Sequence, residues 1–464
     1  MIVIEDNLNK IIELAQQFGA NYSDVRYEKN SSLMISTEDG SIHTISSNIN
    51  EGFNIRILIN GTWGFAASTD IKDYKHTVEK AIKLVKSKPA GTIKLAEIRP
   101  VKEKYAHPHK KDPSRVPLEE KVSLLLDANK EMLKPQIKKS NVAYSENHNK
   151  KLFASSEGSA IEESKFIMYA QAFASSGREY YTDEVGSTTG YELIEDTNLV
   201  DFAKNIADMA IKISKAPNAP TGKTEVILDQ DFAALVAHEI IGHPSEADRV
   251  LGKEAHWAGK TWWEHLRGTQ IAADIVNVVD DSTTKGHFGS FKYDDEGVKG
   301  KRKFLIKDGI LTEHINNRET AATLNMEPNG GMRAASWEYF PLIRMTNTFF
   351  LPSSWKFEEM LSEIKDGIYL CGDKMPSIDW RRFNFQIAAR YGYIIKNGEL
   401  TELVRNPSLA GVTPEFLKSI NAIGNDLKIK SIPNCGKGDP MQTMYVGNGA
   451  PHIRATAHVI GASD

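Results

Sequence analysis

The sequence predicts an α+β protein in two parts, an N-terminal domain of helices and antiparallel hairpins and a C-terminal β-rich domain. In the first half, apolar residues recur at helical spacing in several segments, and turn signals separate short apolar stretches between them. In the second half, strand-like stretches dominate. Residues 216–222, with two prolines and a glycine, form the clearest linker in the chain. We therefore expect one domain over residues 1–220 and a second over residues 221–464.

The composition is that of a globular protein of 464 residues, with 41% hydrophobic and 25% charged residues. A formal net charge of −4 gives no electrostatic bias toward nucleic acid, so we predict no direct nucleic-acid binding. Stretches typical of a signal peptide or a membrane span are not found, and we expect no membrane association. The two cysteines do not form a disulfide framework, which favours the cytoplasm.

In the first domain, apolar spacing predicts a helix over about 8–18 that ends at Gly19. Hairpins are expected around the turn 38–40 and around Asn60-Gly61. A helix then follows Asp70, and the proline-containing segment 90–115 is expected to be a connector. Beyond it we expect a helix over about 116–133, short strands between 141 and 191, and a helix over about 198–214.

The second domain is expected to open with a strand at 225–228 and to continue directly into a helix from about 231 to 241. Strand patterns then follow almost to the end of the chain, with helices predicted at about 356–365 and 414–423. The predicted strands lie at 275–279, 303–306, 310–314, 344–350, 368–371, 383–393 and 399–404.

The helix predicted at 231–241 leads into the motif His238-Glu-Ile-Ile-Gly-His243, which carries the clearest chemical signal in the chain. Neutral imidazole is a common zinc ligand, and a glutamate beside the metal, here Glu239, can act as a general base. Because the histidines are five residues apart, a regular helix would place them roughly 140° apart around its axis. The bland alternative is a chance group of polar residues at a helix end.

Gly242 and Pro244 suggest how both histidines could still reach one ion. We expect Gly242 to end the helix in the left-handed conformation, and Pro244 disfavours helical geometry at His243. His243 would then turn back toward the metal bound by His238. Two acids beyond the motif, Glu246 and Asp248, could orient a ligand imidazole, or could equally be surface acids.

A catalytic zinc site usually has three protein ligands, so the motif is one ligand short. Cys371 lies in an apolar strand and is most simply a buried structural residue. Cys435 lies in a glycine-rich polar stretch that we expect to be a loop, and Lys437 would favour its thiolate. On spacing alone, the choice of Cys435 stays open. The Trp-rich segment 250–268, with His256 and His265, is either a mobile segment or subunit contact near the site or a plain surface helix.

Several stretches together resemble the TldD/PmbA family, also called modulators of DNA gyrase, and specifically its TldD branch. Between 225 and 464 they cover most of the chain, whereas the first domain matches mainly in the order of its elements. The matching stretches are 238–243 with Glu246 and Asp248, 293–297, 329–336, 341–348, 383–398 and 434–437.

The resemblance implies a cytoplasmic zinc peptidase in which His238, His243 and Cys435 hold Zn²⁺ and Glu239 is the catalytic base. It also implies a dimer that encloses a chamber for short or unfolded peptides, either a homodimer or a heterodimer with a PmbA/TldE-like subunit. A peptide would be held in extended form along a sheet edge. Arg344 and Lys437 are the candidates for binding the oxyanion.

Two other functions remain open at this point. The chain could be a metal-stabilised binding or regulatory protein of the gyrase-modulator type, without hydrolytic activity. The presence of Glu239 argues against this, because a structural zinc site needs no general base. It could also be an enzyme that acts on a non-peptide amide, which the motif does not exclude.

Overall fold

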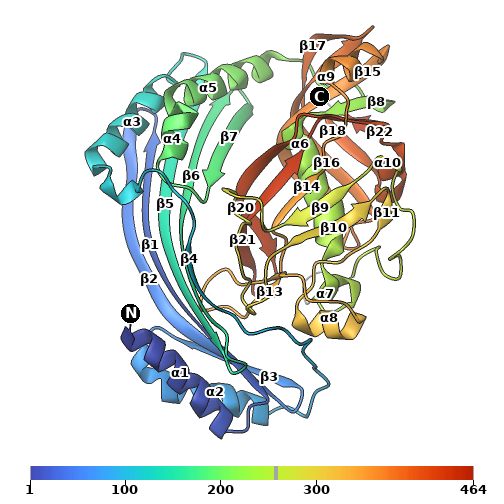
Figure 1. Ribbon diagram of the computed structural model, residues 1–464. Coiled ribbons are helices and arrows are strands. Elements are labelled where there is room, and N and C mark those ends of the chain that lie inside the picture. Colours follow the sequence, from blue (N-terminus) through green and yellow to red (C-terminus); the bar gives the residue numbers. More distant parts are fainter. Residues whose placement is uncertain (1, 255–259, 463–464) are drawn as a thin grey trace.

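The computed structural model describes residues 2–254 and 260–462 and shows a mixed α+β architecture in two halves. Long curved strands of the first half bend around the second half, which lies on their inner side (Figure 1). Strands that precede residue 220 pair with one another and not with later strands in the described parts of the chain. We therefore propose to keep the domain boundary between 1–220 and 221–464.

One sheet of seven strands forms the first half, in the order β3-β2-β1-β5-β6-β4, with β7 paired to β6. The prediction of short strands between 141 and 191 is wrong, because only Gly158 and Gly177 fall at turns between long strands. The expected connector 90–115 also contains one strand, β4. The strands are β1 (Tyr22–Glu38), β2 (Ser41–Ile59), β3 (Thr62–Ser68), β4 (Lys102–Ala106), β5 (Ile137–Ser155), β6 (Ala160–Ser176) and β7 (Glu179–Ser187).

The two faces of this sheet differ in chemistry. Along β1, Val25 and Ile35 point to the same face and join apolar clusters formed with the helices. Arg26 and Asn30 point to the opposite face, which meets the second half. The apolar face holds the helices, and the polar face is left for contacts between the halves. The helices are α1 (Ile2–Gln17), α2 (Tyr74–Lys86), α3 (Leu118–Lys130), α4 (Glu192–Thr197) and α5 (Leu199–Lys215), with 3₁₀ turns at Ile71–Asp73 and Pro113–Arg115.

Two larger sheets and a two-stranded ribbon form the second half. One sheet has the order β15-β8-β22-β18-β16-β17, with β19 paired to β22, and the other has the order β11-β10-β9-β14-β21-β20. The strands are β8 (Gly222–Leu228), β9 (Val278–Asp281), β10 (Arg302–Lys307), β11 (Ile310–Leu311), β12 (Met332–Arg333), β13 (Leu342–Ile343), β14 (Asn347–Phe350), β15 (Asp366–Ile378), β16 (Asn384–Lys396), β17 (Glu399–Arg405), β18 (Ser408–Val412), β19 (Ala422–Ile423), β20 (Lys428–Lys437), β21 (Gln442–Ala450) and β22 (Ile453–Ile460).

Helix α6 (Gln230–Ala237) packs against strands of both large sheets, β15 and β21, and begins at the side-chain cap of Asp229. Its apolar residues, Phe232 and Val236 among them, are fully buried in the main core of this half. This packing fixes the direction in which the following motif residues point. The other helices are α7 (Ala247–Val250), α8 (Arg318–Leu324), α9 (Phe357–Ser362) and α10 (Thr413–Ser419).

Buried ion pairs join the two halves. Asp295 lies 3.0 Å from Arg26 and 2.8 Å from Lys151, and Glu296 lies 3.3 Å from Arg56. Each of these pairs connects the second half to the polar face of the first sheet. The segment 293–297, one of the stretches that carry the family resemblance, therefore contributes to the contact between the halves.

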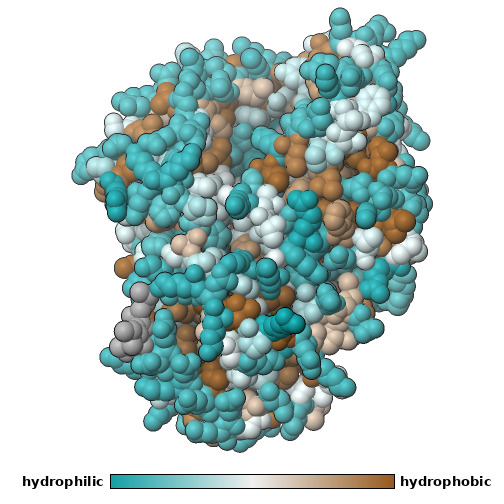
Figure 2. Space-filling model, in the orientation of Figure 1, coloured by the Kyte–Doolittle hydropathy of each residue, from teal (hydrophilic) through white to brown (hydrophobic). Residues whose placement is uncertain are grey.

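Hydrophilic residues cover most of the face seen in Figure 2, and hydrophobic residues occur there in scattered groups. Within the described ranges, the helices are all too short or too polar to cross a membrane.

Candidate metal centre

The motif residues form a helical turn of unusual width. Helix α6 passes directly into a π-helix, His238–Gly242, and then into a 3₁₀ turn, His243–Ser245. The N–H of His243 donates to the carbonyl oxygen of His238, which is the i to i+5 hydrogen bond of a π turn. One such turn brings residues five apart onto the same side. The five-residue spacing of the two histidines is thus matched by the period of the backbone.

The predicted helix break at Gly242 is therefore wrong. Gly242 has φ −59° and ψ −61°, which are right-handed helical values, and not the left-handed conformation. The glycine is needed for a different reason: a Cβ atom built on it would lie 2.1 Å from Sδ of Met345. Gly242 thus allows β-strand neighbours to approach the motif closely.

His238, His243 and Cys435 lie together, buried at the end of α6. One nitrogen or sulfur atom from each lies within 4.8 Å of the other two. Sγ of Cys435 is 3.8 Å from Nε2 of His243. Two imidazole nitrogens and one thiolate sulfur at such distances could converge on one ion at zinc–ligand bond lengths of roughly 2.0–2.3 Å. The donor set thus fits zinc.

Each imidazole is oriented through its other nitrogen. Nδ1 of His238 lies 2.9 Å from Oδ1 of Asn448, and Nδ1 of His243 lies 3.2 Å from Oε2 of Glu246. Both oxygens are acceptors, so both Nδ1 atoms carry hydrogen and both Nε2 atoms are free to bind a metal. The structure therefore places Glu246 where an orienting role requires it.

Cys435 lies on β20 and not in a loop, so that expectation is wrong. The register between β20 and β21 shifts between Ile432 and Cys435, which accommodates Pro433 and Asn434 in a bulge. The bulge interrupts the pairing of β20 directly before Cys435.

Charge around Cys435 favours the thiolate. Burial alone would raise the pKa of this thiol, but His238, His243 and Arg344 outweigh burial and hold the pKa well below its usual value. Burial likewise disfavours the charged form of His238, yet the Cys435 thiolate and Glu239 raise its pKa to about 9. The thiolate is the form that binds metals.

Lys437 does not act on the thiolate as expected, since its ammonium group is bound elsewhere. It lies 3.2 Å from Glu246 and 2.8 Å from Asp248, and it also donates to a backbone carbonyl. Arg344 donates to the carbonyl oxygens of Gln442 and Cys435 and is fully buried. Both candidate oxyanion groups are thus engaged in holding the protein together.

Glu239 borders the same cavity, which has a volume of about 320 Å³. Its carboxylate accepts a hydrogen bond from Nη1 of Arg382, whose side chain also lines the cavity. Burial would raise the pKa of Glu239, but the Arg382 guanidinium and the two imidazoles hold it below its usual value. Glu239 is therefore ionised at neutral pH, as a general base must be.

Sequence reasoning missed two residues of this site, Asn448 and Arg382. Asn448 lies 210 residues from His238, and Arg382 lies 143 residues from Glu239. Arg382 belongs to the 383–398 hairpin region that carried part of the resemblance, and this was the one available signal. Neither residue stands in a local pattern that indicates a role in metal or substrate binding.

Other expected candidates lie away from the site. Cys371 is buried in β15, as predicted, and burial together with Asp229 raises the pKa of its thiol well above the usual value. The described part of the Trp-rich segment, 260–268, is not a helix; His265 is exposed and Trp263 is fully buried. His256 and Trp257 fall outside the described residues.

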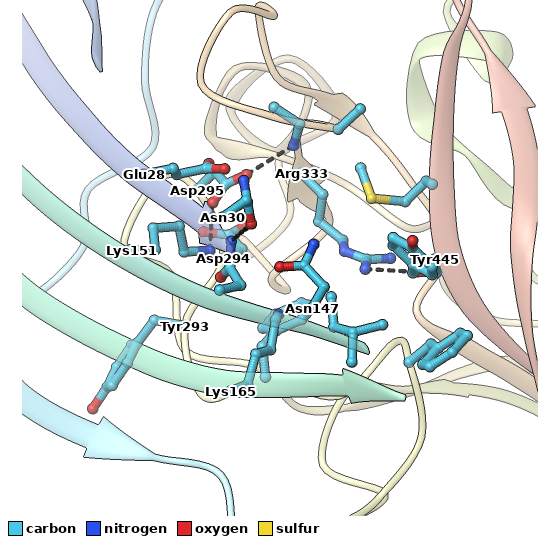
Figure 3. A pocket seen from close by; sticks show the side chains of 17 residues that line it. Glu28, Asn30, Asn147, Lys151, Lys165, Tyr293, Asp294, Asp295, Arg333 and Tyr445 are labelled. Carbon is cyan, nitrogen blue, oxygen red and sulfur yellow. Dashed lines mark hydrogen bonds and ion pairs between the residues drawn. The ribbon is translucent and has the colours of Figure 1, made fainter. Parts of the chain in front are cut away.

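A second cavity, of about 110 Å³, lies between the two halves and is lined by none of the predicted site residues (Figure 3). Its charged side chains are largely paired: Lys151 lies 2.8 Å from Asp295, and Arg333 donates to the carbonyl oxygen of Tyr445. These contacts join the inner face of the first sheet to the second half. We interpret this cavity as part of the contact between the halves.

Comparison with known proteins identifies relatives over almost the whole chain. Models of the PmbA/TldA metallopeptidase domains match residues 23–85 (domain 1), 111–213 (central domain) and 221–461 (C-terminal domain). A metalloprotease of Methanocaldococcus jannaschii is 35% identical over 98% of this chain and 99% of its own. A zinc metalloprotease TldD homolog of Saccharolobus solfataricus is 29% identical over 97% of this chain and 99% of its own.

Solved structures show the same fold at lower sequence identity. A protein of Thermotoga maritima described as a candidate modulator of a DNA gyrase has a TM-score of 0.80 at 19% identity, over 98% of this chain and 100% of that chain. TldE of Thermococcus kodakarensis has a TM-score of 0.75 at 16% identity, again over 98% and 100%.

Proposed function

Because the chain belongs to the PmbA/TldA metallopeptidase family, we propose that it is a zinc-dependent peptidase acting on short or unfolded peptides. One observation carries this proposal. The buried group formed by His238, His243 and Cys435 opens into a cavity that also holds the carboxylate of Glu239. A metal-binding set beside an ionised general base is the arrangement that hydrolysis of a peptide bond requires.

In this proposal Nε2 of His238, Nε2 of His243 and Sγ of Cys435 hold Zn²⁺. When bound, the zinc ion supplies Lewis acidity, which lowers the pKa of water and polarises the peptide carbonyl. The Glu239 carboxylate removes a proton from the attacking water and delivers it to the leaving amine. Asn448 and Glu246 keep the two imidazoles in the orientation and tautomer that binding needs.

We propose that the peptide binds in extended form beside β20. This strand is the last in its sheet and carries Cys435, so a substrate pairing with its edge would pass close to the metal ligands. A cavity of about 320 Å³ accommodates only a few residues of an extended peptide and no folded domain. Short or unfolded substrates are therefore favoured.

We further propose that the protein works as a dimer, with a second copy or with a related PmbA/TldE-like subunit. Residues 41–52 of β2 form a sheet edge, because β3 pairs only with the portion of β2 from Phe53 onward. Ile42, Ile45 and Ile49 on this portion are 48%, 44% and 63% exposed. Unpaired edges with exposed apolar residues are typical of association surfaces. The similarity to TldE supports a related partner.

A cytoplasmic location is the remaining part of the proposal. Both cysteines are free, and a metal site with a thiolate ligand needs Cys435 to stay reduced. A reducing compartment fits this requirement.

The test of the proposal is metal content together with peptide hydrolysis by the purified chain. We expect about one zinc per chain, hydrolysis of unstructured peptides, loss of activity with a chelator and recovery with added zinc. Glu239→Gln should keep zinc and fold while slowing hydrolysis by about 10²–10⁴-fold, the usual contribution of a general base. If Glu239→Gln leaves both zinc and hydrolysis unchanged, the non-hydrolytic regulatory function becomes the better account.

A further inference from the structure

Arg382 approaches the proposed general base from the side of the cavity opposite its own strand pair. It lies in the loop between β15 and β16, and its Nη1 donates to Oε2 of Glu239. Both side chains line the cavity that holds the metal-binding group, and they are 18% and 11% exposed. The guanidinium therefore lies directly beside the position where the peptide bond would be attacked, and solvent or substrate can reach it.

The other cations near the site are bound to partners that have no role in the reaction. Arg344 and Lys437 hold backbone carbonyls and acids, as described above. Lys430 also lines the cavity but lies 2.7 Å from Asp183 and 3.5 Å from Asp373. Among the residues that the structure describes, the Arg382 side chain forms a hydrogen bond or ion pair with Glu239 alone.

The loop holds Arg382 in a conformation that needs external support. Its φ of +62° is in the left-handed region, which costs a non-glycine residue of order 1 kcal/mol or more. The Asp379 carboxylate accepts three backbone N–H groups of the loop, those of Arg381, Phe383 and Asn384. The hydroxyl of Thr413 donates to the carbonyl oxygen of Arg382 at 2.8 Å. A strained residue supported in this way is typical of a functional position.

We propose that Arg382 is a catalytic residue of the peptidase site: its guanidinium binds the oxygen of the peptide carbonyl under attack and stabilises the negative charge that develops there. The proposal rests on the function proposed above. When the guanidinium turns from Glu239 to this oxygen, the carboxylate becomes free to accept the proton of the attacking water. Water adds to the carbonyl carbon, the C–N bond breaks, and Glu239 passes the proton to the amine. Arg382 neither gains nor loses a proton.

The position of Arg382 favours the carbonyl oxygen over other substrate groups. A guanidinium that contacts the base directly lies within one residue of the carbon under attack. It presents several N–H donors in one plane, so it can contact an oxygen while it remains close to Glu239. The terminal carboxylate of a peptide would lie near enough only when cleavage occurs at the last residue.

Three variants test this role. Arg382→Asn removes the guanidinium and tolerates the left-handed backbone, and Arg382→Lys keeps a positive charge without the planar donors. Arg381→Asn is the matched control, because Arg381 is the neighbouring residue in the same loop but is exposed and stacks on Trp380. Each variant is assayed for zinc content, thermal stability and hydrolysis of an unstructured peptide with an amidated C-terminus. Calorimetry then measures the affinity of a phosphinic pseudopeptide, whose anionic oxygens mimic the charged carbonyl.

With Arg382→Asn we expect kcat to fall about 10²–10³-fold, as when one oxyanion donor is removed, and KM to change less than about threefold. The affinity for the phosphinic pseudopeptide should fall by a similar factor to kcat/KM, while zinc content stays at the wild-type level. Arg382→Lys should restore part of both losses. Arg381→Asn should behave as the wild type.

Unchanged affinity for the phosphinic pseudopeptide would overturn the proposal, even if hydrolysis slows, since Arg382 would then act only through Glu239. A loss confined to peptides with a free terminal carboxylate would overturn it as well. A failure of the underlying function looks different: the wild-type protein, loaded with zinc, would then hydrolyse no peptide. If Arg382→Asn does not fold, Arg382→Lys still decides the matter through the same two affinities.

Discussion

Cys371 and Cys435 are almost equally buried, at 2% and 3% exposed, yet their chemistry is opposite. The pKa of the Cys371 thiol is raised well above its usual value, and that of Cys435 is lowered well below it. Both lie on β-strands of the same half, β15 and β20. Burial and secondary structure are thus common to both, and the difference must come from the neighbouring charges.

Around Cys371 the strongest charged neighbour is the carboxylate of Asp229, which opposes ionisation in the same direction as burial. Around Cys435 the neighbours are the imidazoles of His238 and His243 and the guanidinium of Arg344. A poorly solvated site strengthens whichever interaction is present. The comparison teaches that the metal-binding cysteine is distinguished by its partners and not by its own strand or its burial.

The largest effect is expected from removing the thiolate itself. Cys435→Ser should abolish stable zinc binding and with it hydrolysis, a loss greater than the about 100-fold that follows loss of an outer partner. Cys371→Ser is the matched control and should keep zinc at the wild-type level. Metal analysis after dialysis measures both. Loss of zinc from Cys371→Ser, with Cys435→Ser unaffected, would reverse the assignment.

The next largest effect concerns the partner that orients His243. Glu246→Gln keeps the size of the side chain but removes the charge beside Nδ1, so zinc affinity should fall about 10–100-fold. Competition with a chelator measures the affinity. Asp248→Asn serves as the control, since Asp248 shares Lys437 with Glu246 but has no contact with the imidazole. Equal losses in both variants would mean that Glu246 acts through Lys437.

A smaller effect is expected from closing the space at the π turn, which brings both imidazoles to Cys435. Gly242→Ala places a methyl group against Met345 and should cost about 1–3 kcal/mol in the free energy of unfolding. Part of this cost, up to about 1.4 kcal/mol or tenfold, should appear in zinc affinity. Urea unfolding and chelator competition measure the two quantities.

Two variants control this experiment. Gly411→Ala adds a methyl group that meets the Phe385 ring at an ordinary 3.5 Å and should be nearly neutral. Met345→Ala, combined with Gly242→Ala, frees the space and should recover most of the zinc affinity. A Gly242→Ala protein that matches Gly411→Ala in both measurements contradicts the role assigned to this close approach.

The smallest effect is the pH dependence of thiol alkylation in metal-free protein. Cys435 has a lowered pKa and is thiolate throughout, so its rate should change less than about twofold between pH 6 and pH 9. Cys371 has a raised pKa and stays a thiol, so its reaction in the folded protein should be negligible at pH 6 and rise with pH. Mass spectrometry of each single-cysteine variant follows the reaction. A Cys435 rate that rises tenfold per pH unit would show an ordinary thiol.

The comparison also shows what the sequence could and could not predict. The α+β class, the motif helix and the buried strand around Cys371 followed from periodicity and composition, because these features are local. The four proposed site residues were assembled through the family resemblance, and spacing alone left Cys435 open. The structure brings three of them together as metal-binding atoms and places Glu239 on the cavity that they share.

The missed features depend on contacts between distant parts of the chain. A glycine before His243-Pro244 is compatible with a left-handed break and with a π turn, and only the packing of Met345 distinguishes them. Cys435 was expected in a loop because a bulge conceals the strand pairing in a stretch rich in glycine and proline. Arg382 reaches Glu239 through a hairpin loop that no local pattern connects to the motif.

X-ray absorption at the zinc edge tests the central claim most directly, because it identifies the atoms that hold the metal. The account predicts one sulfur at about 2.3 Å and two imidazole nitrogens at about 2.0 Å, with an oxygen completing the site. The sulfur signal should persist in Cys371→Ser and be absent from any residual zinc in Cys435→Ser. Zinc bound without sulfur in the wild-type protein, or a sulfur signal that disappears with Cys371, would contradict the account.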